Sequence, residues 1–254
     1  MKAIFLAGGF ATRLYPITEF TPKPLLPVFG KPIIHYILDK TEGIPEIDTV
    51  YISTNSRFEH HFRNWMSHLK TGKEVKLTVE ESAHEDEKMG AVAALNYVIT
   101  KEKIDDDLLI IAGDNLFDIE LADFIKRFKS KKCPTVAFYD MKKKIPERFG
   151  IGVLDSDNMV INFEEKPKVP KSTLVSTACY ILPKEELKKV KEYLKDQQDS
   201  DAPGYFIAWL MQKHKVCGYK FEGKWFDIGT MESYKEACLE YEKRLTCQFS
   251  KHTT

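Results

Sequence analysis

The chain has 254 residues, of which 43% are hydrophobic and 30% charged, the composition of an ordinary globular protein. Basic and acidic residues number 38 each, so the net charge of zero gives no electrostatic basis for binding nucleic acid or an anionic membrane. No stretch approaches the roughly 18 apolar residues that a bilayer-spanning helix needs. The five cysteines form no C-x-x-C pair, and no signal-peptide pattern opens the chain, which predicts reduced thiols and a cytoplasmic location.

The first two-thirds of the chain alternates short apolar runs with amphipathic stretches. This pattern predicts strands at 3–7, 49–53, 75–79 and 108–112, and helices from 32, at 57–70, at 90–100 and at 118–132. The run at 108–112 is entirely apolar, as expected for a strand buried on both faces of a parallel sheet. Strand and helix in alternation predict βαβ units and a doubly wound α/β sheet.

After Cys133 the pattern changes, because short strands follow one another closely. Strands are predicted at 135–139, 152–154, 159–163, 178–182 and 216–221, and helices at 183–195, 206–212 and 230–245. We interpret the first four of these strands as a β-rich insertion on the same sheet. Because no linker or repeat interrupts the chain, residues 1–254 are predicted to form a single domain, with the last residues, from about 247, frayed.

The first buried strand ends at Gly8-Gly9, and two cations, Arg13 and Lys23, follow in a proline-rich stretch. Glycine has no Cβ, so backbone N–H groups at this turn can approach a ligand closely and form an anion-binding concavity. A glycine turn with a nearby arginine and lysine suits a polyphosphate, although a glycine pair alone is more often only a turn. Neither a Walker A loop nor a G-x-G-x-x-G dinucleotide fingerprint is present.

The whole run LAGGFATRLYPITEFTPKPLLPVFGKPI resembles the signature of the sugar-nucleotidyltransferase family. Members of this family join a sugar 1-phosphate to a nucleoside triphosphate and use Mg²⁺. The resemblance implies a three-layer α/β/α fold with a Rossmann-like, mostly parallel sheet and a β-rich insertion on the sugar side. The chain is similar to glucose-1-phosphate thymidylyl- and uridylyltransferases in a short form without a C-terminal β-helix. It departs from the signature at Ala11, where the family usually has glycine.

The resemblance assigns roles to the opening stretch. It implies that the turn binds the nucleotide and that Arg13 stabilises the leaving pyrophosphate. Lys23 is implied to bridge the triphosphate and the sugar phosphate. The nucleotide-binding residues of the turn are Leu6, Ala7, Gly8 and Gly9.

Two aspartates are candidate metal ligands. Asp114 follows the central strand, and ligands of α/β sheets bind at the carboxyl ends of strands. Mg²⁺ commonly lies between one or two carboxylates and substrate phosphates. Asp227 lies in WFDIGT, which resembles the family's W-x-D-x-G-T motif and implies the second metal ligand. The alternative for each is a structural role, as a turn residue for Asp114 and as a helix cap for Asp227.

The sugar side is also assigned by resemblance. Glu165 and Lys166 match the family's E-K-P motif, in which the glutamate contacts sugar hydroxyls and the lysine holds the sugar phosphate, so Lys166 is also counted among the catalytic residues. Gly150 matches a turn that lines the sugar pocket. Thr177 is a further sugar-side candidate, but Ala178 stands where the family usually has glycine, which leaves the sugar open.

The base side is less constrained. Gly90, in MGAVAAL, matches the family's L-G-T-A-G-A-L, in which the glycine backbone reads the base. The base-reading glutamine of the family, five residues earlier, falls on Glu85 here. A carboxylate accepts hydrogen bonds and does not donate them, so Glu85 suits the amino group of cytosine or guanine better than uracil or thymine. Alternatively, the acidic stretch 80–88 shifts this alignment and forms a solvated loop.

The sequence therefore predicts a nucleotidyltransferase that converts a sugar 1-phosphate, with glucose 1-phosphate favoured, and dTTP or UTP into a nucleotide sugar and pyrophosphate. Three alternatives stay open: a cytidylyl- or guanylyltransferase acting on another sugar or alcohol phosphate, a glycosyltransferase of similar fold, and a non-catalytic nucleotide-binding subunit. The D-x-D sequences that a glycosyltransferase would need, at 155–157 and 199–201, fall in predicted turns. The resemblance further suggests a homo-oligomer.

Overall fold

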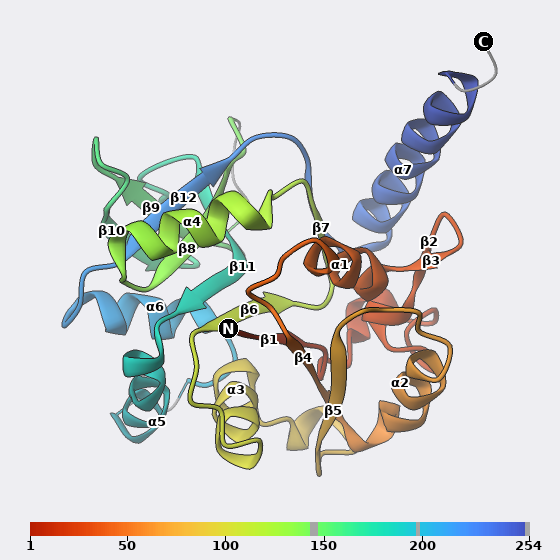
Figure 1. The fold of residues 1–254 in the computed structure, drawn as a ribbon, viewed down its shortest axis with the longest axis horizontal. Coiled ribbons are helices and arrows are strands. Elements are labelled where there is room, and N and C mark those ends of the chain that lie inside the picture. The colour runs from red at the N-terminus through yellow and green to blue at the C-terminus, as the bar shows by residue number, and fades with distance from the viewer. Residues whose placement is uncertain (143–146, 197–198, 252–254) are drawn as a thin grey trace.

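The computed structural model describes residues 1–142, 147–196 and 199–251. Within these residues a nine-stranded mixed sheet forms the centre of the molecule, and the predicted α/β class is confirmed (Figure 1). Its main path runs β10-β9-β11-β6-β1-β4-β5, with β8 and β12 continuing from β11. The strands are β1 (Lys2–Leu6), β4 (Thr49–Asn55), β5 (Glu74–Glu80), β6 (Leu108–Ala112), β8 (Thr135–Asp140), β9 (Gly150–Leu154), β10 (Val160–Glu165), β11 (Leu174–Leu182) and β12 (Cys217–Phe221).

The parallel half of the sheet contains β5, β4, β1 and β6. Strand β1 lies between β4 and β6, and its last residue, Leu6, pairs with Ser53 on one side and Ala112 on the other. The carboxyl ends of the three strands therefore meet at one edge. The middle of β1 is fully buried, because helices cover both faces of this half of the sheet.

The second half is the β-rich insertion predicted from the sequence, and it belongs to the same sheet. Strand β11 runs antiparallel to β6 and β8, and β9 and β10 form an antiparallel pair beside it. Strand β12 returns parallel to β8. The register of β11 shifts between Ser176 and Tyr180, so this strand carries a bulge where it faces the carboxyl edge of β6.

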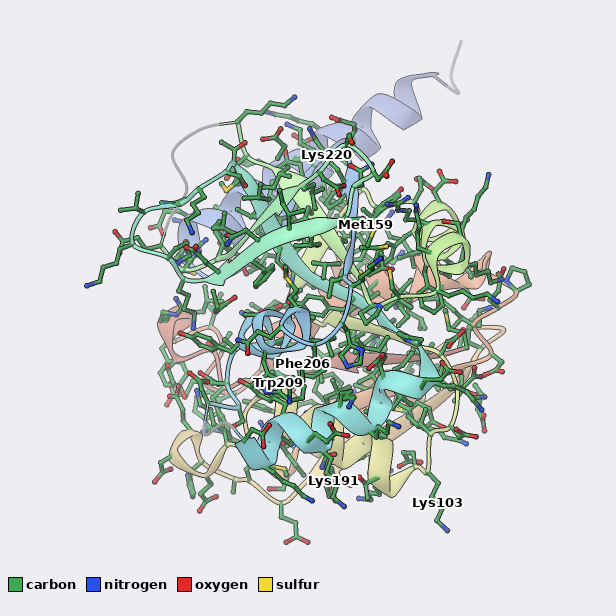
Figure 2. The ribbon with its side chains drawn as sticks, turned by 90° about the vertical axis from the view of Figure 1, so that its left-hand side faces the viewer. Lys103, Met159, Lys191, Phe206, Trp209 and Lys220 are labelled. Atoms are coloured by element: carbon green, nitrogen blue, oxygen red, sulfur yellow. The ribbon has the colours of Figure 1, made fainter. Side chains whose placement is uncertain are left out.

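Helices cover both faces of the sheet and create the three predicted layers. One hydrophobic core joins the sheet to α1 (Ile33–Glu42), α2 (Glu59–Met66) and α4 (Leu121–Lys131), and a second joins its other face to α3 (Ala91–Lys101), α5 (Leu187–Asp196) and α6 (Pro203–Met211). Phe206 and Trp209 of α6 stack with their ring centroids 6.2 Å apart (Figure 2). None of the helices in the described ranges is long and apolar enough to cross a membrane.

The last helix, α7 (Met231–Lys251), starts against the N-terminal loops and extends away from the body of the molecule (Figure 1). Tyr234, Cys238 and Tyr241 pack against a small third core that contains Leu14 and Ile228. Fraying was expected from about residue 247, and the backbone is described as helical as far as Lys251. Residues 252–254 lie outside the described part.

Two short antiparallel pairs of strands were not predicted from the sequence. They are β2 (Pro27–Val28) with β3 (Lys31–Pro32), and β7 (Asn115–Phe117) with β13 (Trp225–Asp227). Strands of two or three residues carry too little alternation to be detected. The helix predicted from 118 begins only at Leu121, as α4, and strand β7 ends before it at Phe117.

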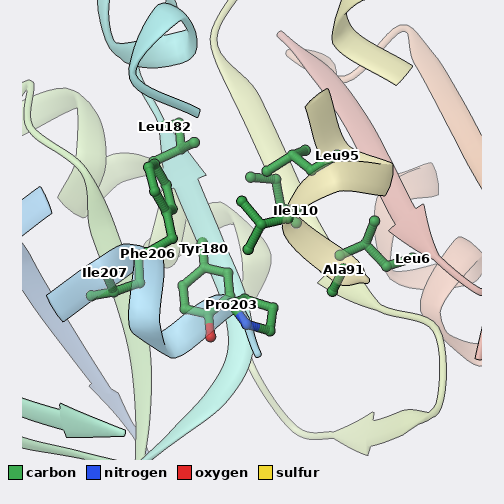
Figure 3. Close-up of a pocket in the computed structure, with 10 residues that line it drawn as sticks. Leu6, Ala91, Leu95, Ile110, Tyr180, Leu182, Pro203, Phe206 and Ile207 are labelled. Carbon is green, nitrogen blue, oxygen red and sulfur yellow. The ribbon is translucent and has the colours of Figure 1, made fainter. Parts of the chain in front are cut away.

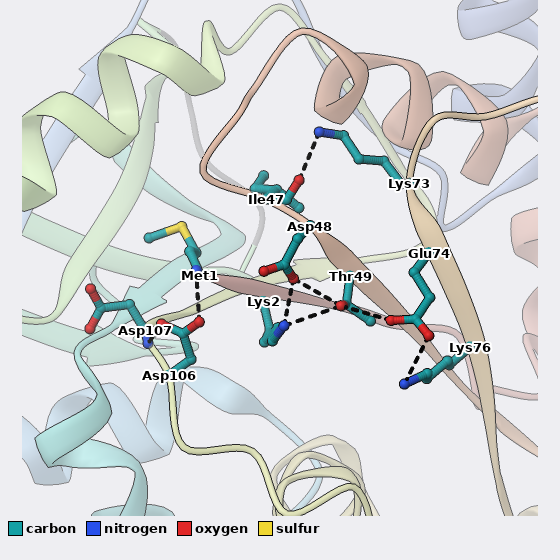
Figure 4. A network of polar contacts seen from close by, with 10 residues as sticks. All are labelled: Met1, Lys2, Ile47, Asp48, Thr49, Lys73, Glu74, Lys76, Asp106 and Asp107. Carbon is teal, nitrogen blue, oxygen red and sulfur yellow. Dashed lines mark hydrogen bonds and ion pairs between the residues drawn. The ribbon is translucent and has the colours of Figure 1, made fainter.

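The amino edge of the parallel strands is closed by polar contacts (Figure 4). The N-terminal ammonium lies 2.8 Å from Asp106, and Lys2 Nζ lies 2.6 Å from Asp48. The hydrogen bond to Asp48 raises the pKa of Lys2. We therefore expect ligands at the opposite edge, where the carboxyl ends of the strands carry the loops.

Candidate active site

The glycine turn lies at the carboxyl end of β1 and is held by its neighbouring strands. The Ala7 N–H donates to the Ser53 carbonyl at 2.8 Å, and the Asn55 side-chain amide donates to the Gly8 carbonyl at 2.9 Å. A Cβ placed on Gly8 would lie 3.0 Å from Glu80 Oε1, whereas one on Gly9 would meet no atom within 4 Å. Gly8 therefore permits the close approach of a buried carboxyl, and Gly9 faces open space.

Ala11 follows this turn in the left-handed region, with φ of 52°. The Thr18 hydroxyl donates to the Ala11 carbonyl at 2.8 Å and holds the loop in this conformation. Ala178, in the β11 bulge, has the same φ of 52°. Both alanines thus stand where the family usually has glycine, and both keep the backbone conformation that glycine favours.

Two cations line the cavity above the turn. Arg13 lies in a short 3₁₀ turn (Thr12–Leu14), and its side chain is exposed. Lys23 opens a second 3₁₀ turn (Lys23–Leu25), and its side chain is only 14% exposed. Lys23 Nζ forms an ion pair with Asp114 Oδ2. The lysine that the resemblance assigns to phosphate is thus in direct contact with the first candidate metal ligand.

Asp227 is brought to the same place by the β7–β13 pair, in which it lies opposite Asn115. Its pKa is raised, chiefly by burial and then by the negative charge of Asp114, while Lys23, Arg148 and Arg13 oppose the rise. Arg148 Nη2 lies 3.2 Å from Asp227 Oδ2. The two predicted acids therefore share one electrostatic environment with three cations.

Arg148 contacts a candidate site residue, and the sequence analysis assigned it no role. Arg148 stands two residues before Gly150, but only Gly150 was assigned a role from the sequence. Its guanidinium also lies over the Phe149 ring, 4.8 Å from the centroid. The structure places this cation on Asp227.

The base side is formed by the loop after β5 and the start of α3. Glu85 and Gly90 both line the cavity. The Val92 N–H donates to the Ser200 carbonyl at 2.9 Å, and the Ser200 hydroxyl donates to the Met89 carbonyl at 2.7 Å. The predicted base-reading loop is therefore fastened to the segment before α6.

Glu80 is a second residue that the sequence analysis did not single out. It is the last residue of β5, is 4% exposed and lines the cavity opposite Gly8. The Ser82 hydroxyl donates to Glu80 Oε1 at 2.9 Å, and burial raises the pKa of this carboxyl. The only sequence signal was its position directly after the strand predicted at 75–79, at the start of the acidic stretch 80–88.

Glu165, on the sugar side, is the last residue of β10 and lies against two glycines. A Cβ on Gly204 would lie 1.7 Å from Glu165 Oε2, and one on Gly150 would lie 2.6 Å from it. Burial raises the pKa of Glu165 to about 7, an effect that the charge of Lys166 opposes and that of Asp199 reinforces. At neutral pH this carboxyl can both donate and accept hydrogen bonds.

Lys166 and Thr177 differ in their access to a ligand. Lys166 has φ of 51°, and its ammonium lies 5.9 Å from the centroid of the Tyr205 ring. Thr177 is 1% exposed, and its hydroxyl donates to the Ala137 carbonyl at 3.1 Å. Its neighbour Ala178 lines the cavity. A direct sugar contact from Thr177 would require its hydroxyl to leave this backbone partner.

The glycine turn, the two cations that follow it and the base-side loop surround one cavity of about 380 Å³ at the carboxyl edge of the sheet. Of the predicted site residues, its walls contain Leu6, Ala7, Gly8, Gly9, Arg13, Lys23, Glu85, Gly90 and Asp114. Gly150, Glu165, Lys166, Thr177 and Asp227 are not among its lining residues. The nucleotide half of the predicted site is thus assembled around this space, and the sugar half lies outside its walls.

A small apolar cavity of about 10 Å³ adjoins the site (Figure 3). Leu6, Ala91, Tyr180 and Pro203 line both spaces. Its remaining lining residues come from the core between the sheet, α3 and α6. The floor beneath the nucleotide half is therefore apolar, so polar selectivity must come from the walls and loops.

Comparison with known proteins identifies the family of this chain. The sequence model of the family described as "Nucleotidyl transferase" matches residues 2–244. The chain belongs to the nucleotidyl transferase family. The fold and the enzyme class expected from the opening stretch are thereby confirmed.

Individual nucleotidyl transferase relatives differ in their named substrates. The chain is 32% identical over 229 residues to "Bifunctional protein GlmU" of Methanocaldococcus jannaschii. This alignment covers 90% of this chain and 51% of that protein. The chain is 30% identical over 240 residues to "Putative mannose-1-phosphate guanyltransferase" of Sulfolobus acidocaldarius, covering 94% of this chain and 63% of that protein. The chain thus spans between half and two-thirds of the length of these two relatives.

One solved structure is similar to this chain over nearly its full length. A crystal structure named as a "Putative Glucose-1-Phosphate Thymidylyltransferase" from Bacillus anthracis superposes with a TM-score of 0.79 and 28% sequence identity. The match covers 94% of each chain. The architecture of this nucleotidyl transferase therefore corresponds to that of a protein of similar length.

Proposed function

We propose that the protein transfers a nucleotidyl group from a nucleoside triphosphate to a sugar 1-phosphate and releases pyrophosphate. The observation that carries this proposal is the meeting of Lys23 with Asp114 beside the Gly8-Gly9 turn, in one cavity at the carboxyl edge of the sheet. A cation and exposed backbone amides bind phosphate oxygens directly, and a carboxylate can do so through a bound Mg²⁺.

In the proposed reaction an oxygen of the sugar 1-phosphate attacks the α-phosphorus of the triphosphate in line with the leaving pyrophosphate. The turn would cradle the phosphates, and Arg13 would stabilise the charge on the pyrophosphate as it leaves. Lys23 would neutralise charge between the two substrates, and Lys166 would hold the attacking phosphate. Positioning and charge stabilisation provide the rate enhancement, since phosphoryl-type transfer needs little covalent chemistry from the protein.

Asp114 and Asp227 would hold Mg²⁺. Their oxygens are ligands that this ion prefers, and burial together with mutual repulsion, which raise the pKa of Asp227, makes a cation favourable there. No cluster of three ligand-bearing side chains occurs among the described residues, so phosphates and water would complete the coordination. Bound Mg²⁺ would supply charge neutralisation at the α-phosphate.

On the sugar side, Glu165 is proposed to bind hydroxyl groups and Gly150 to line the pocket. A carboxyl with a pKa of about 7 can serve as donor or acceptor, which suits a sugar hydroxyl that does both. The proposed sugar phosphate is glucose 1-phosphate, in line with the named substrate of the Bacillus anthracis relative. On the same ground the proposed nucleotide is dTTP. UTP is proposed beside it, because uracil carries the same hydrogen-bonding groups as thymine.

A second candidate is a guanylyl- or cytidylyltransferase, favoured by the two acids on the base side. Glu80 and Glu85 both line the cavity. An ionised carboxylate accepts two hydrogen bonds, which matches the adjacent N–H donors of guanine or the amino group of cytosine. The named substrate of the Sulfolobus acidocaldarius relative also supports this candidate.

The test is a matrix of the common nucleoside triphosphates against several sugar 1-phosphates, with and without Mg²⁺, read as pyrophosphate release. The proposal expects at least one productive pair and a strict requirement for Mg²⁺. Release with dTTP or UTP supports the first candidate, and release with GTP or CTP supports the second. Binding of nucleotide without turnover in any pair would overturn the enzymatic proposal and favour a binding subunit.

A further inference from the structure

Two of the dispersed cysteines come together far along the sheet from the glycine turn. Cys133 lies between α4 and β8, Cys217 is the first residue of β12, and their Sγ atoms are 2.6 Å apart. This separation exceeds the roughly 2.05 Å of a disulfide bond by only about half an ångström. Among the cysteines that the structure describes, no other two are recorded in contact.

The backbone fixes this meeting of sulfurs. Strands β8 and β12 are parallel neighbours, and Cys217 pairs with Thr135, two residues after Cys133. The Cys217 N–H donates to the Pro134 carbonyl at 2.8 Å. The approach of the thiols is therefore determined by strand pairing and not by flexible side chains.

The two thiols have different surroundings. Cys133 is partly exposed, whereas Cys217 is fully buried. Met159 lies beside the buried sulfur, with its Sδ 3.5 Å from Cys217 Sγ. A reagent from solution therefore reaches Cys133 first, and Cys217 is positioned to react only with Cys133.

Electrostatics favour a thiolate in the pair. The pKa of Cys217 is lowered, first by the hydrogen bond from Cys133 and then by the positive charges of Arg127 and Lys131 on α4, while burial opposes the shift. The pKa of Cys133 is raised by the same hydrogen bond. A thiolate is the nucleophile in thiol–disulfide exchange, so the lowered pKa prepares Cys217 for the second attack, on the Cys133 sulfur. Exposure makes Cys133 the thiol that an external disulfide meets first.

We propose that Cys133 and Cys217 form an oxidisable dithiol that a low-molecular-weight disulfide converts into a reversible intramolecular disulfide. The Cys133 sulfur, after losing its proton, attacks the external disulfide and releases the first small thiolate. Cys217 then attacks the Cys133 sulfur and releases the second. The protein loses two electrons and two protons, and the external disulfide gains them as two thiols.

The link would join the amino ends of β8 and β12, and neither cysteine lines the cavity. It would close a long loop that contains β9, β10 and β11, and closing a long loop stabilises a fold by restricting the unfolded chain. Oxidation is therefore expected to raise the melting temperature and to leave pyrophosphate release within about twofold of the reduced protein.

The experiment treats the full chain with oxidised glutathione, blocks remaining thiols with an alkylating agent and maps the peptides by mass spectrometry. The proposal expects the Cys133 and Cys217 peptides to be joined, with a loss of two hydrogens that dithiothreitol reverses. The melting temperature of the oxidised protein should rise by about 5 °C or more over the reduced protein. A stable glutathione adduct on Cys133, or two unmodified peptides, would overturn the proposal.

Cys133→Ala and Cys238→Ala provide a matched pair, since both positions are partly exposed. Cys133→Ala should abolish the joined peptide and the rise in melting temperature, and Cys238→Ala should change neither. If Cys133→Ala proves unstable, the peptide map of the wild-type protein decides alone. A rise in melting temperature that persists in Cys133→Ala would refute the assignment.

Discussion

Asn115 lies directly opposite Asp227 in the antiparallel pair of β7 and β13, and its side-chain amide donates to Asp114 at 3.0 Å. The Trp225 indole N–H donates to the Asn115 side-chain carbonyl at 2.8 Å. A short ribbon between distant parts of the chain therefore positions both proposed metal ligands.

The first prediction concerns these two acids. Asp114→Asn and Asp227→Asn each keep the side-chain shape and remove a charge that Mg²⁺ would require. Pyrophosphate release is expected to fall at least about 100-fold in each variant. Asp157→Asn, at an exposed turn, is the control and should keep wild-type turnover.

The same variants report on stability. Because the pKa of Asp227 is raised, its ionised form is disfavoured in the fold, and Asp227→Asn should not lower the melting temperature. An inactive variant with an intact melting transition supports the metal-ligand role. Wild-type turnover in either variant would refute it.

The second prediction concerns base selectivity. Glu80→Gln replaces an acceptor by an amide that donates and accepts, which matches uracil and thymine better. The ratio of kcat/KM for UTP or dTTP over GTP or CTP is expected to rise at least about tenfold. Glu81→Gln, at an exposed neighbouring position, should leave the ratio unchanged. If Glu85→Gln shifts the ratio and Glu80→Gln does not, the base is read at position 85.

The third prediction is a pH dependence that comes from Glu165. Its pKa of about 7 in the folded protein lies above its ordinary value, so between roughly pH 4.5 and 7 the folded state binds more protons than the unfolded state. The free energy of unfolding therefore falls as the pH rises through this window. Urea titrations at pH 4.5 and 7.5 should show wild-type protein losing about 2 kcal/mol more than Glu165→Gln.

The matched control for this pH effect is Glu164→Gln, next to Glu165 but paired with Lys171 on the surface. This variant should keep the wild-type loss between the two pH values. An equal loss in wild-type protein and Glu165→Gln would show that the Glu165 carboxyl titrates near its ordinary value.

The fourth prediction concerns Ala11, which holds a left-handed backbone. Glycine relieves a strain of about 1–2 kcal/mol there, while its freedom in the unfolded chain costs about 0.5–1 kcal/mol. Ala11→Gly should therefore leave the free energy of unfolding unchanged or raise it by up to about 1 kcal/mol. Ala122→Gly, at an exposed position in α4, should lower it by about 1 kcal/mol. Equal losses in both variants, measured by urea denaturation, would contradict the left-handed assignment.

Much of the fold was predictable because its main strands are distinct apolar runs and its helices are long enough to show a period. The apolar run at 108–112 became β6 at its expected bounds, and the helix predicted at 90–100 became α3 within a residue. The glycine turn and Asp114 both follow parallel strands, whose carboxyl ends share one edge, and they line one cavity with Lys23. Strands β7 and β13 were missed, since three residues show no period.

The site residues that were missed depend on contacts across the chain. Arg148 was singled out because it forms an ion pair with Asp227, and Glu80 because it lies against Gly8. Neither contact leaves a pattern in the local sequence. The conformation of Ala11 belongs to the same class, because the substitution was visible but the φ of 52° was not.

The sequence by itself determined the α/β class, the family and the position of the Gly8-Gly9 turn that we propose binds the triphosphate, because periodicity and motif are local properties. Only the tertiary structure decided which charges act on one another: Lys23 on Asp114, Arg148 on Asp227, and Cys133 on Cys217. The physical reason is that a pKa or an ion pair depends on distance and burial, and both are set by how separate strands pair. The second candidate metal ligand, Asp227, comes near the proposed polyphosphate turn only because β13 pairs with β7.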